Sequence, residues 1–366
     1  MGKLVLLRLF DALWGLISIV PAIMAVGGFY SSRFHPAKHI DIQWLGLFLA
    51  LILVINILVM LYWIWRKRFW FIFPLFALLL NIPFLSTMFQ WPFKTIEPAK
   101  REVKIGTYNM QEEQNEDFSA IGEEMRDLLL KEKPAIFCIQ QFPQEEAVQG
   151  AFIEKISTLL PYYTIHASSP QNMHIALFSR YPIMQSQMIP FQEETRNVSM
   201  WADLLVEGDT IRIFNSHLQT TGRNQNRIRP LISIRQTLSR MHRLKKVMND
   251  NWMIRAAQSD IISALIDESP YPLIVCGDFN DTSASYTYRM MKGDLEDSFR
   301  SCGRGYAYSY KYLKKLFRID YVFYSRGLFR GTRYYSPEMK YSDHKPVIVT
   351  LDFNPIPPSS VVQNRR

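Results

Sequence analysis

Three long apolar runs in the first ninety residues constrain this chain more than any other feature of its sequence. Leu45–Trp65 and Phe69–Phe89 carry no charge, and Leu4–Val26 carries only Arg8 and Asp11, which are one helical turn apart and can pair. Each run is about 20 residues long, which at about 1.5 Å per residue crosses the roughly 30 Å hydrocarbon core of a bilayer. We therefore expect a transmembrane region over residues 1–92, with spans at about 4–26, 45–65 and 69–89.

Basic residues in the short loops predict the orientation of these spans. Arg66, Lys67 and Arg68 separate the second and third runs, and Lys3 and Arg8 lie near the N-terminus. Because positively charged loops stay in the cytoplasm, residue 92 onward is expected on the outer side. The basic start leaves a cleavable signal peptide as the alternative for the first run. We expect an integral membrane protein with the lipid bilayer as its partner and its polar domain on the outer face, which is the periplasm if the membrane is the inner membrane of a Gram-negative bacterium.

The composition of the whole chain excludes two classes of protein. Of the 366 residues, 48% are apolar and 14% are aromatic, which excludes a disordered chain. The three cysteines are few and odd in number, which excludes a secreted module held by disulfides. Lysine and arginine outnumber aspartate and glutamate by 42 to 33, which gives a net charge of +9.

After a polar linker at residues 93–100, short apolar runs rich in β-formers recur up to residue 353. Several follow one another without an intervening helix, so a pair of mixed sheets fits better than a doubly wound parallel sheet. Helical spacing of apolar residues indicates one helix from Phe118 and another over Ala256–Ile266. We expect one α/β domain over residues 101–353 and a flexible tail at 354–366. The expected strands are Val103–Tyr108, Ala135–Ile139, Ile175–Ser179, Ile211–Ser216, Leu273–Cys276, Tyr321–Tyr324 and Val347–Leu351.

The expected strands end in polar residues of one kind. Carboxylates and amides supply the oxygen ligands that Mg²⁺ prefers, and they suit phosphate-bearing substrates. Each residue also has a structural alternative: Asp278 can shape a turn, Asn280 can cap a helix, and His217 can be a core histidine. The chain has no Gly-rich phosphate loop, no Gly-x-Ser-x-Gly elbow and no zinc-type cysteine pair. The strand-end residues are Asn109, Gln141, Asn215, His217, Asp278, Asn280, Asp320, Asp343 and His344.

Five short motifs occur in a specific order along this domain. They are Thr107-Tyr108-Asn109, Asn215-Ser216-His217-Leu218, Gly277-Asp278-Phe279-Asn280-Asp281, Arg318-Ile319-Asp320-Tyr321 and Ser342-Asp343-His344. The set closely resembles the endonuclease/exonuclease/phosphatase superfamily, which includes deoxyribonucleases, apurinic endonucleases and neutral sphingomyelinases. The three apolar runs, together with Thr282–Arg289 after the Gly-Asp-Phe-Asn motif, look like a membrane-anchored bacterial branch of it. The resemblance covers residues 101–353 and implies a four-layer α/β sandwich, in which two packed mixed β-sheets are flanked by helices.

The resemblance also implies catalytic roles for five of these residues. Asp278 would orient or deprotonate the attacking water, and Asn280 would hold that water or a phosphate oxygen. His344, oriented by Asp320, would contact a phosphoryl oxygen. His217 would stabilise charge or protonate the leaving oxygen. A metal and an imidazolium together offset the charge that gathers on the equatorial oxygens of a phosphodiester transition state.

The metal ligands that the resemblance implies are Asn109, residue 141 and Asp343, with Mg²⁺ as the expected ion and Mn²⁺ or Ca²⁺ as alternatives. Position 141 departs from the family, because Ile139-Gln140-Gln141 stands where the family has Leu-Gln-Glu. Glutamine keeps one carbonyl oxygen but loses the charge, so Mg²⁺ should bind more weakly. Three explanations stay open: a substitution made to stop turnover, a natural variant in which Asp343 or another carboxylate holds the metal, and a protein that binds a phosphodiester without cleaving it.

Two further features bear on the substrate. Residues 221–255 carry nine Lys and Arg against Asp250 alone. They could contact nucleic acid, lie on anionic lipid headgroups or form a solvated helix face. Tyr306, Tyr308, Tyr310 and Tyr312 alternate as one face of a β-ribbon would, and could also stack bases or enter a membrane interface. The anchor favours a lipid, because a tethered enzyme meets lipid phosphodiesters at high effective concentration.

The sequence thus predicts a membrane-anchored, divalent-metal-dependent phosphodiesterase, similar to sphingomyelinases. It would hydrolyse a lipid or sphingolipid headgroup by metal-assisted in-line attack of water. The alternatives are a Mg²⁺-dependent nuclease acting on DNA or RNA and a catalytically silent phosphodiester-binding module. The complete set of other motif residues favours an enzyme, since a binding module has no need to keep them together. The sequence indicates no protein partner.

Overall fold

The chain forms two compact units. The computed structural model describes residues 2–110, 118–169, 172–191, 195–220, 234–312 and 315–354. The first unit, the helical unit, contains Met1–Met88 together with Thr282–Arg289. The second, the sandwich unit, contains Phe89–Asp281 and Met290–Arg366. Residues 221–233 of the basic segment and nearly all of the expected tail lie outside the described residues.

The helical unit contains the three apolar runs of the sequence. Its first helix is long and apolar enough to cross a membrane over Leu9–Ser31. The other two runs each form a pair of helices, bent by 62° and 58°. By length and composition, the described part of the chain thus has one membrane-crossing helix, and up to three if each bent pair is one span. The helices are α1 (Gly2–Ser31), α2 (Ile40–Leu47), α3 (Leu49–Trp65), the 3-10 helix η1 (Phe69–Phe71), α4 (Ile72–Leu80) and α5 (Ile82–Met88).

The two breaks fall at Phe48 and at Asn81, within the runs expected as spans over 45–65 and 69–89. Near the first break, Gln43 Nε2 in α2 donates to the carbonyl oxygens of Ser31 and Phe34, each at 3.0 Å, which holds α2 against the end of α1. Near the second break, Pro83 has no amide hydrogen to continue the α4 hydrogen-bond pattern, and the helix restarts after Asn81. Hydropathy registers neither break, because the chain stays apolar through both.

Hydrogen bonds from buried polar side chains join the helices of this unit. Trp63 Nε1 in α3 donates to Ser18 Oγ in α1 at 3.0 Å. Asn81 Nδ2, between α4 and α5, donates to the Ala25 carbonyl oxygen of α1 at 3.1 Å. A buried polar group without a partner costs free energy, so these bonds favour one packing of the helices over others.

Asp11 marks one end of the helical unit. Its carboxylate accepts from Arg66 Nη2 at 2.7 Å and from Arg68 Nε at 2.9 Å. The Arg8 side chain, its expected partner, lies outside the described side chains. The α3–η1 loop therefore lies at the Asp11 end of α1, away from Ser31 at the other end of that helix.

The sandwich unit contains two six-stranded sheets. In the first, the strand order is β13-β14-β2-β3-β5-β4, and in the second it is β10-β12-β9-β8-β7-β6. The pairs β2–β3 and β8–β9 are parallel and the other pairs are antiparallel, so both sheets are mixed. The strands are β2 (Glu102–Asn109), β3 (Ile136–Phe142), β4 (Tyr162–Ala167), β5 (His174–Ser179), β6 (Ile183–Ile189), β7 (Ser199–Val206), β8 (Asp209–His217), β9 (Leu273–Asp278), β10 (Glu296–Asp297), β12 (Asp320–Tyr324), β13 (Phe329–Tyr335) and β14 (Val347–Phe353).

Apolar side chains between the two sheets form the main core. Ile105 of β2 belongs to one fully buried cluster with Ile213 of β8 and Ile274 of β9. Cys138 and Cys276 lie in the same cluster, and neither forms a disulfide. The inner faces of both sheets are thus packed against each other, as the resemblance implied.

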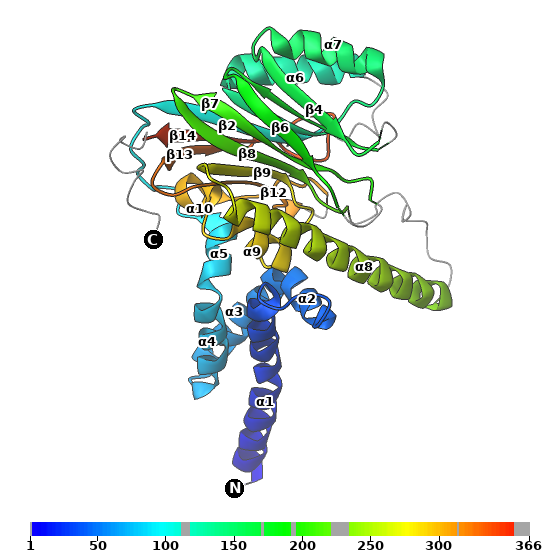
Figure 1. The fold of residues 1–366 in the computed structure, drawn as a ribbon. Helices are drawn as coiled ribbons and strands as arrows, with labels where there is room; N and C mark the ends of the chain where they lie inside the picture. The colour runs from blue at the N-terminus through cyan, green and yellow to red at the C-terminus, as the bar shows by residue number, and fades with distance from the viewer. Residues whose placement is uncertain are drawn as a thin grey trace. The chain divides into compact units, whose positions relative to one another are not determined.

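Helices cover the outer faces of both sheets (Figure 1). On the first sheet, Met125 of α6 (Phe118–Glu132) and Phe152 of α7 (Glu146–Ser157) pack in one cluster with Phe137 of β3. On the second sheet lies α8 (Ile234–Asp267), whose Gln258 Oε1 accepts from the Gln219 amide just after β8 at 2.8 Å. The order is helices, sheet, sheet, helix, which confirms the expected four-layer sandwich.

Two expectations at the rim of the sandwich need correction. Phe89, expected at the end of the third span, belongs to β1 (Phe89–Gln90), which pairs with β11 (Gly305–Tyr306). The tyrosine ribbon is shorter than expected, because Tyr306 is in β11 but Tyr310 makes only an isolated bridge to His344. The remaining short helices are α9 (Tyr286–Lys292) and α10 (Ser298–Cys302).

Candidate active site

Asp278, the last residue of β9, lies at the centre of the polar strand ends. Strand register places His217 beside it on β8 and Asp320 beside it on β12. Its side chain is 1% exposed. The parallel pairs β2–β3 and β8–β9 end at this edge of the sandwich, which is why residues far apart in the sequence meet around one carboxylate.

Two amides and one backbone N–H hold the Asp278 carboxylate. Asn109 Nδ2, at the end of β2, donates to Asp278 Oδ2 at 2.9 Å. Asn280 Nδ2 donates to the same oxygen at 3.1 Å, and the Asn280 backbone N–H donates to Oδ1 at 2.8 Å. Asn280 has a φ of 52°, in the left-handed region that asparagine tolerates better than most residues. This turn fixes the direction of the carboxylate.

His344 and Asp320 form a buried pair next to Asp278. His344 Nδ1 lies 2.9 Å from Asp320 Oδ2, and because a carboxylate oxygen accepts, Nδ1 carries the hydrogen. Nε2 then lies 3.7 Å from Asp278 Oδ2 and 3.7 Å from Asp343 Oδ1. The pair therefore presents one imidazole nitrogen toward the carboxylates of the site.

Two serines and one tyrosine support this pair, and the sequence did not single out these contacts. Ser342 Oγ accepts from the His344 backbone N–H at 3.0 Å, and Ser309 Oγ accepts from the Asp320 backbone N–H at 3.0 Å. The Tyr310 ring meets the His344 ring edge-on, with centroids 5.4 Å apart. Alternating tyrosines were the available signal for Tyr310, but nothing in that pattern pointed to histidine.

Burial shifts the pKa values of two site residues in opposite directions. Burial raises the pKa of Asp278 to about 6, and the Asp320 charge raises it while His344 and the hydrogen bonds lower it. Burial lowers the pKa of His217 to about 3, and repulsion from His344 lowers it too. The His217 imidazole of the free chain is therefore neutral at pH 7. Its Nε2 lies 3.6 Å from Asp278 Oδ2.

Gln141 sits in a β-bulge at the end of β3. Gln140 pairs with Ile175 and Phe142 pairs with His174, so Gln141 is the extra residue of the bulge. Its φ is 51° and its side chain is buried. Bulges and left-handed residues are frequent next to active sites, where they redirect a side chain. Among the described residues, no hydrogen bond joins the Gln141 side chain to another site residue.

Gln140, the preceding residue, has a different environment. Its Nε2 donates to Asn215 Oδ1 at 2.6 Å and to Thr107 Oγ1 at 2.9 Å. Asn215 Nδ2 in turn donates to the Ala176 carbonyl oxygen at 2.9 Å. Asn215 of β8 therefore joins the second sheet to β3 and β5 of the first sheet. Its side chain holds the sheets together near the site and does not bind Asp278.

The donor set fits a divalent cation. Among the described residues, no lysine or arginine lies within 4.0 Å of the Asp278 or Asp320 carboxylate, and their charged partners are histidines. Oxygens of Asp278 and Asp320 and a nitrogen of His344 lie within 4.8 Å of one another. Buried carboxylates with so little compensating charge are costly unless a cation or a proton joins them. Asp343 is 5% exposed and adds a third carboxylate.

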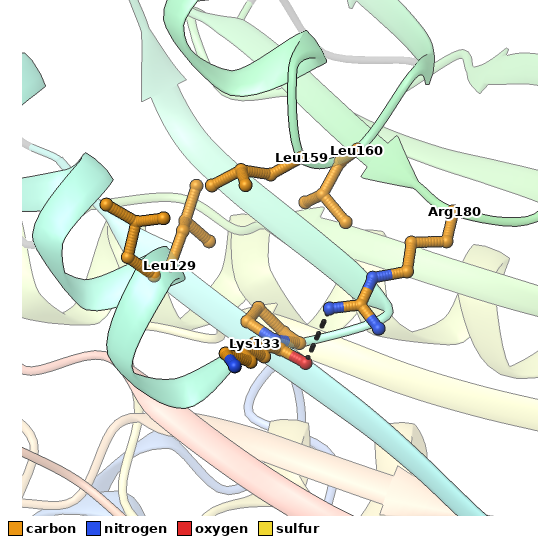
Figure 2. Close-up of a pocket in the computed structure, with 7 residues that line it drawn as sticks. Leu129, Lys133, Leu159, Leu160 and Arg180 are labelled. Carbon is orange, nitrogen blue, oxygen red and sulfur yellow. Dashed lines mark hydrogen bonds between the residues drawn. The ribbon is translucent and has the colours of Figure 1, made fainter.

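The hollow drawn in Figure 2 does not coincide with this site. It lies among α6, α7 and the far ends of β3 and β5, lined mainly by Leu129, Leu159 and Leu160. Arg180 Nη2 donates there to the Lys133 carbonyl oxygen at 3.1 Å. Its volume of about 110 Å³ is below the roughly 300–1,000 Å³ that is typical of ligand pockets. We assign it no function.

Sequence models of two families match the chain. The Endonuclease/Exonuclease/phosphatase family matches residues 106–344, and a domain of unknown function (DUF8431) matches residues 8–88. No curated protein matches the chain.

Several solved structures of low sequence identity are similar to this chain. An endonuclease/exonuclease/phosphatase family protein from Leptotrichia buccalis is 14% identical, with 69% of this chain and 100% of that chain covered and a TM-score of 0.50. The Bacteroides thetaiotaomicron mannosyl-6-phosphatase is 18% identical over 69% of this chain and 100% of that one, with a TM-score of 0.47. The human Nocturnin catalytic domain with bound sulfate is 16% identical over 70% and 96%, with a TM-score of 0.49.

Proposed function

Because the chain belongs to the endonuclease/exonuclease/phosphatase family, we propose that it is a membrane-anchored, divalent-metal-dependent phosphodiesterase acting on a lipid headgroup. The observation that carries the chemistry is the buried Asp278 carboxylate, held by Asn109 and Asn280 and flanked by the His344–Asp320 pair. A carboxylate base, an imidazole and several oxygen ligands meet where the strands end at one edge of the sandwich. This combination suits hydrolysis of a phosphate ester.

Asn109, Gln141 and Asp343 would hold the metal, near the group formed by Asp278, Asp320 and His344. When bound, a divalent cation polarises a phosphoryl oxygen and offsets the charge of the transition state. Gln141 contributes a neutral amide oxygen in place of a carboxylate. We propose that this weakens metal affinity without removing the site, because Asp343 supplies a negative charge.

The chain's own residues then divide the remaining work. Asp278, whose pKa of about 6 keeps it ionised at neutral pH, accepts a proton from the attacking water. The Asn280 amide holds that water or a phosphate oxygen. His344 Nε2 contacts a phosphoryl oxygen, and Asp320 keeps the imidazole in one tautomer and one orientation. His217, which is neutral, contributes its ring nitrogens as hydrogen-bonding groups beside Asp278.

The helical unit supports an outward-facing sandwich unit. Arg66 and Arg68 lie at the Asp11 end of α1, where their positive charges indicate the cytoplasmic side. The chain then runs from the Arg66–Arg68 loop through α4 and α5 as its third crossing, and it leaves the helical unit at Met88. If each bent pair is one span, residue 89 onward lies outside the cytoplasm, in the periplasm of a Gram-negative cell.

A lipid substrate is supported by the anchor and by the described part of α8. Met241 and Leu244 are 62% and 43% exposed on this helix. Arg243, Lys245 and Lys246 beside them are exposed too. Basic residues mixed with exposed apolar ones are typical of helices that contact anionic lipid surfaces.

A substrate panel tests this function. The full chain in nanodiscs is given a short-chain sphingolipid phosphodiester, a glycerophospholipid, single-stranded DNA and RNA, each with Mg²⁺ and with chelator. The matched control is His344→Ala. Metal-dependent hydrolysis of a lipid that His344→Ala lacks supports the proposal. Hydrolysis of nucleic acid alone would overturn the lipid proposal in favour of the nuclease alternative. Binding without turnover in both the native chain and Gln141→Glu would indicate a binding module.

A further inference from the structure

Eight residues of the sandwich sequence belong to the helical unit. Asp278–Asp281 form the turn of the candidate site, and the segment Thr282–Arg289 follows it directly. This segment is part of the compact helical unit, and the chain returns to the sandwich unit at Met290. Its contacts with the transmembrane helices are therefore internal contacts of one unit.

Two hydroxyl groups of the helices hold the segment. Ser31 Oγ, at the end of α1, donates to the Ala284 carbonyl oxygen at 2.6 Å, and Ser31 is fully buried. Thr87 Oγ1, near the end of α5, lies 2.5 Å from Ser283 Oγ. Both helix ends lie far along the chain from the segment, so these bonds belong to the tertiary structure of the unit.

Apolar packing continues these bonds. Ala284 is 5% exposed and belongs to one buried cluster with Ala25 of α1 and Leu49 of α3. The rings of His35 and Tyr286 meet edge-on at 4.9 Å between centroids. A segment that merely covered a surface would not place its alanine in the apolar core of the helices.

Gly46 provides the space for this arrangement. A Cβ atom at Gly46 would lie 2.3 Å from Ser31 Oγ and 3.3 Å from the Ala284 carbonyl oxygen. Only glycine lets α2 approach the end of α1 and the segment this closely. Gly15 is a matched position in the same unit, because a Cβ there would lie 2.3 Å from the Trp70 ring, at a contact that does not involve the segment.

The residues just before the segment are held in the sandwich unit. The Tyr321 hydroxyl donates to the Asp281 carbonyl oxygen at 3.0 Å, and Arg255 Nε lies 3.3 Å from Asp281 Oδ2. The Asn280 N–H binds Asp278. Asp278–Asp281 of the sandwich unit and Thr282–Arg289 of the helical unit are thus consecutive in the chain.

We propose that Thr282–Arg289 is a positioning element, through which the transmembrane helices fix the turn that carries Asn280 and Asp281. The helical unit is then a structural part of the active enzyme as well as its anchor. Full turnover requires this unit to be folded around the segment. The kinetic part of this inference rests on the proposed function, and its structural part does not.

The test compares Gly46→Ala with Gly15→Ala in the full chain. Hydrogen–deuterium exchange is followed on the peptide that contains Asn280, and kcat and KM are measured with a soluble phosphodiester. We expect Gly46→Ala to speed exchange at this peptide and to lower kcat about tenfold with little change in KM, since small misplacements in an active site are costly. Gly15→Ala should do neither. Equal effects of the two variants, or none from Gly46→Ala, would overturn the proposal.

A milder pair and a crosslink keep the test decisive if the glycine variants fold poorly. Ser31→Ala removes the bond to Ala284, and Ser18→Ala is its control in the same helix. Thr87→Cys together with Ser283→Cys should form a disulfide that preserves kcat, because the two native hydroxyl oxygens lie 2.5 Å apart and the native cysteines are buried. Absence of that disulfide would contradict the proposal. If no variant hydrolyses any ester, exchange and crosslinking still decide the structural part.

Discussion

His344 Nδ1 donates to Asp320 Oδ2 at 2.9 Å, and these two residues are 4% and 0% exposed. Because this buried hydrogen bond keeps the hydrogen on Nδ1, it fixes both the orientation of the imidazole ring and its tautomer. The other nitrogen then faces Asp278 and Asp343, where a phosphoryl oxygen would lie.

Loss of this bond should reduce turnover without abolishing the fold. We expect Asp320→Asn to lower kcat about 100-fold or more, because an asparagine can favour the wrong tautomer of its histidine partner. Asp352→Asn is the control, since Asp352 is also buried but accepts from Arg330 at the far end of β14. Steady-state kinetics on correctly folded protein measure kcat for both variants. Equal kcat values for Asp320→Asn and Asp352→Asn would contradict the role of Asp320 in orienting His344.

The raised pKa of Asp278 predicts a stability that depends on pH. A carboxyl group whose pKa is higher in the folded than in the unfolded chain destabilises the fold above the folded pKa of about 6, and this cost disappears below the unfolded value of 3.8. Asp278→Asn should therefore stabilise the chelator-treated protein at pH 8, by on the order of 3 kcal/mol. Thermal unfolding should show this gain shrinking toward zero by pH 4. A gain that is constant with pH would refute the shift.

Gln141→Glu should strengthen metal binding. A carboxylate in place of a neutral amide adds a charged oxygen ligand, and we expect Mg²⁺ affinity to rise about tenfold or more. Calorimetric titration of the metal-free protein measures this directly. Gln140→Glu is the matched control, because its side chain binds Asn215 and Thr107, and a charge there should cost stability without improving affinity. Equal affinities for the native chain and the Gln141→Glu variant would remove residue 141 from the metal site.

The proposed orientation of the helical unit in the membrane can be measured with single cysteines. The three native cysteines are buried, so they give a low background. Lys67→Cys, in the loop between α3 and η1, should react with an impermeant maleimide only after the inner membrane is opened. Arg304→Cys, exposed in the sandwich unit, should react in intact spheroplasts. The reverse pattern would place the sandwich unit in the cytoplasm.

The positions of seven strands along the chain, and the polar residues at their ends, were predictable from the sequence. Apolar β-rich runs that end in polar residues are local patterns. Each expected strand is present, and Asp278, Asn280 and Asn109 meet as hydrogen-bonded neighbours. What local patterns could not predict depends on tertiary structure. The bulge that places Gln141 in the left-handed region arises from pairing with β5, and the contact of Tyr310 with His344 joins two distant loops.

The helical unit shows the same limit. Composition identified three apolar runs, but the bend after α2 depends on Gln43 binding the end of α1. Membership of Thr282–Arg289 in this unit left no trace in hydropathy, because the segment is polar and its contacts with the helices come from two hydrogen bonds, one buried alanine and the Tyr286 ring. Long-range packing of this kind is visible only in three dimensions.

The most direct test of the central claim is hydrolysis of a chromogenic phosphodiester by the intact chain, Gln141→Glu and Asp278→Asn, each titrated with Mg²⁺. The account predicts metal-dependent turnover in the native chain, half-maximal at a lower Mg²⁺ concentration in Gln141→Glu, and none in Asp278→Asn. Turnover that survives both chelator and Asp278→Asn would contradict it.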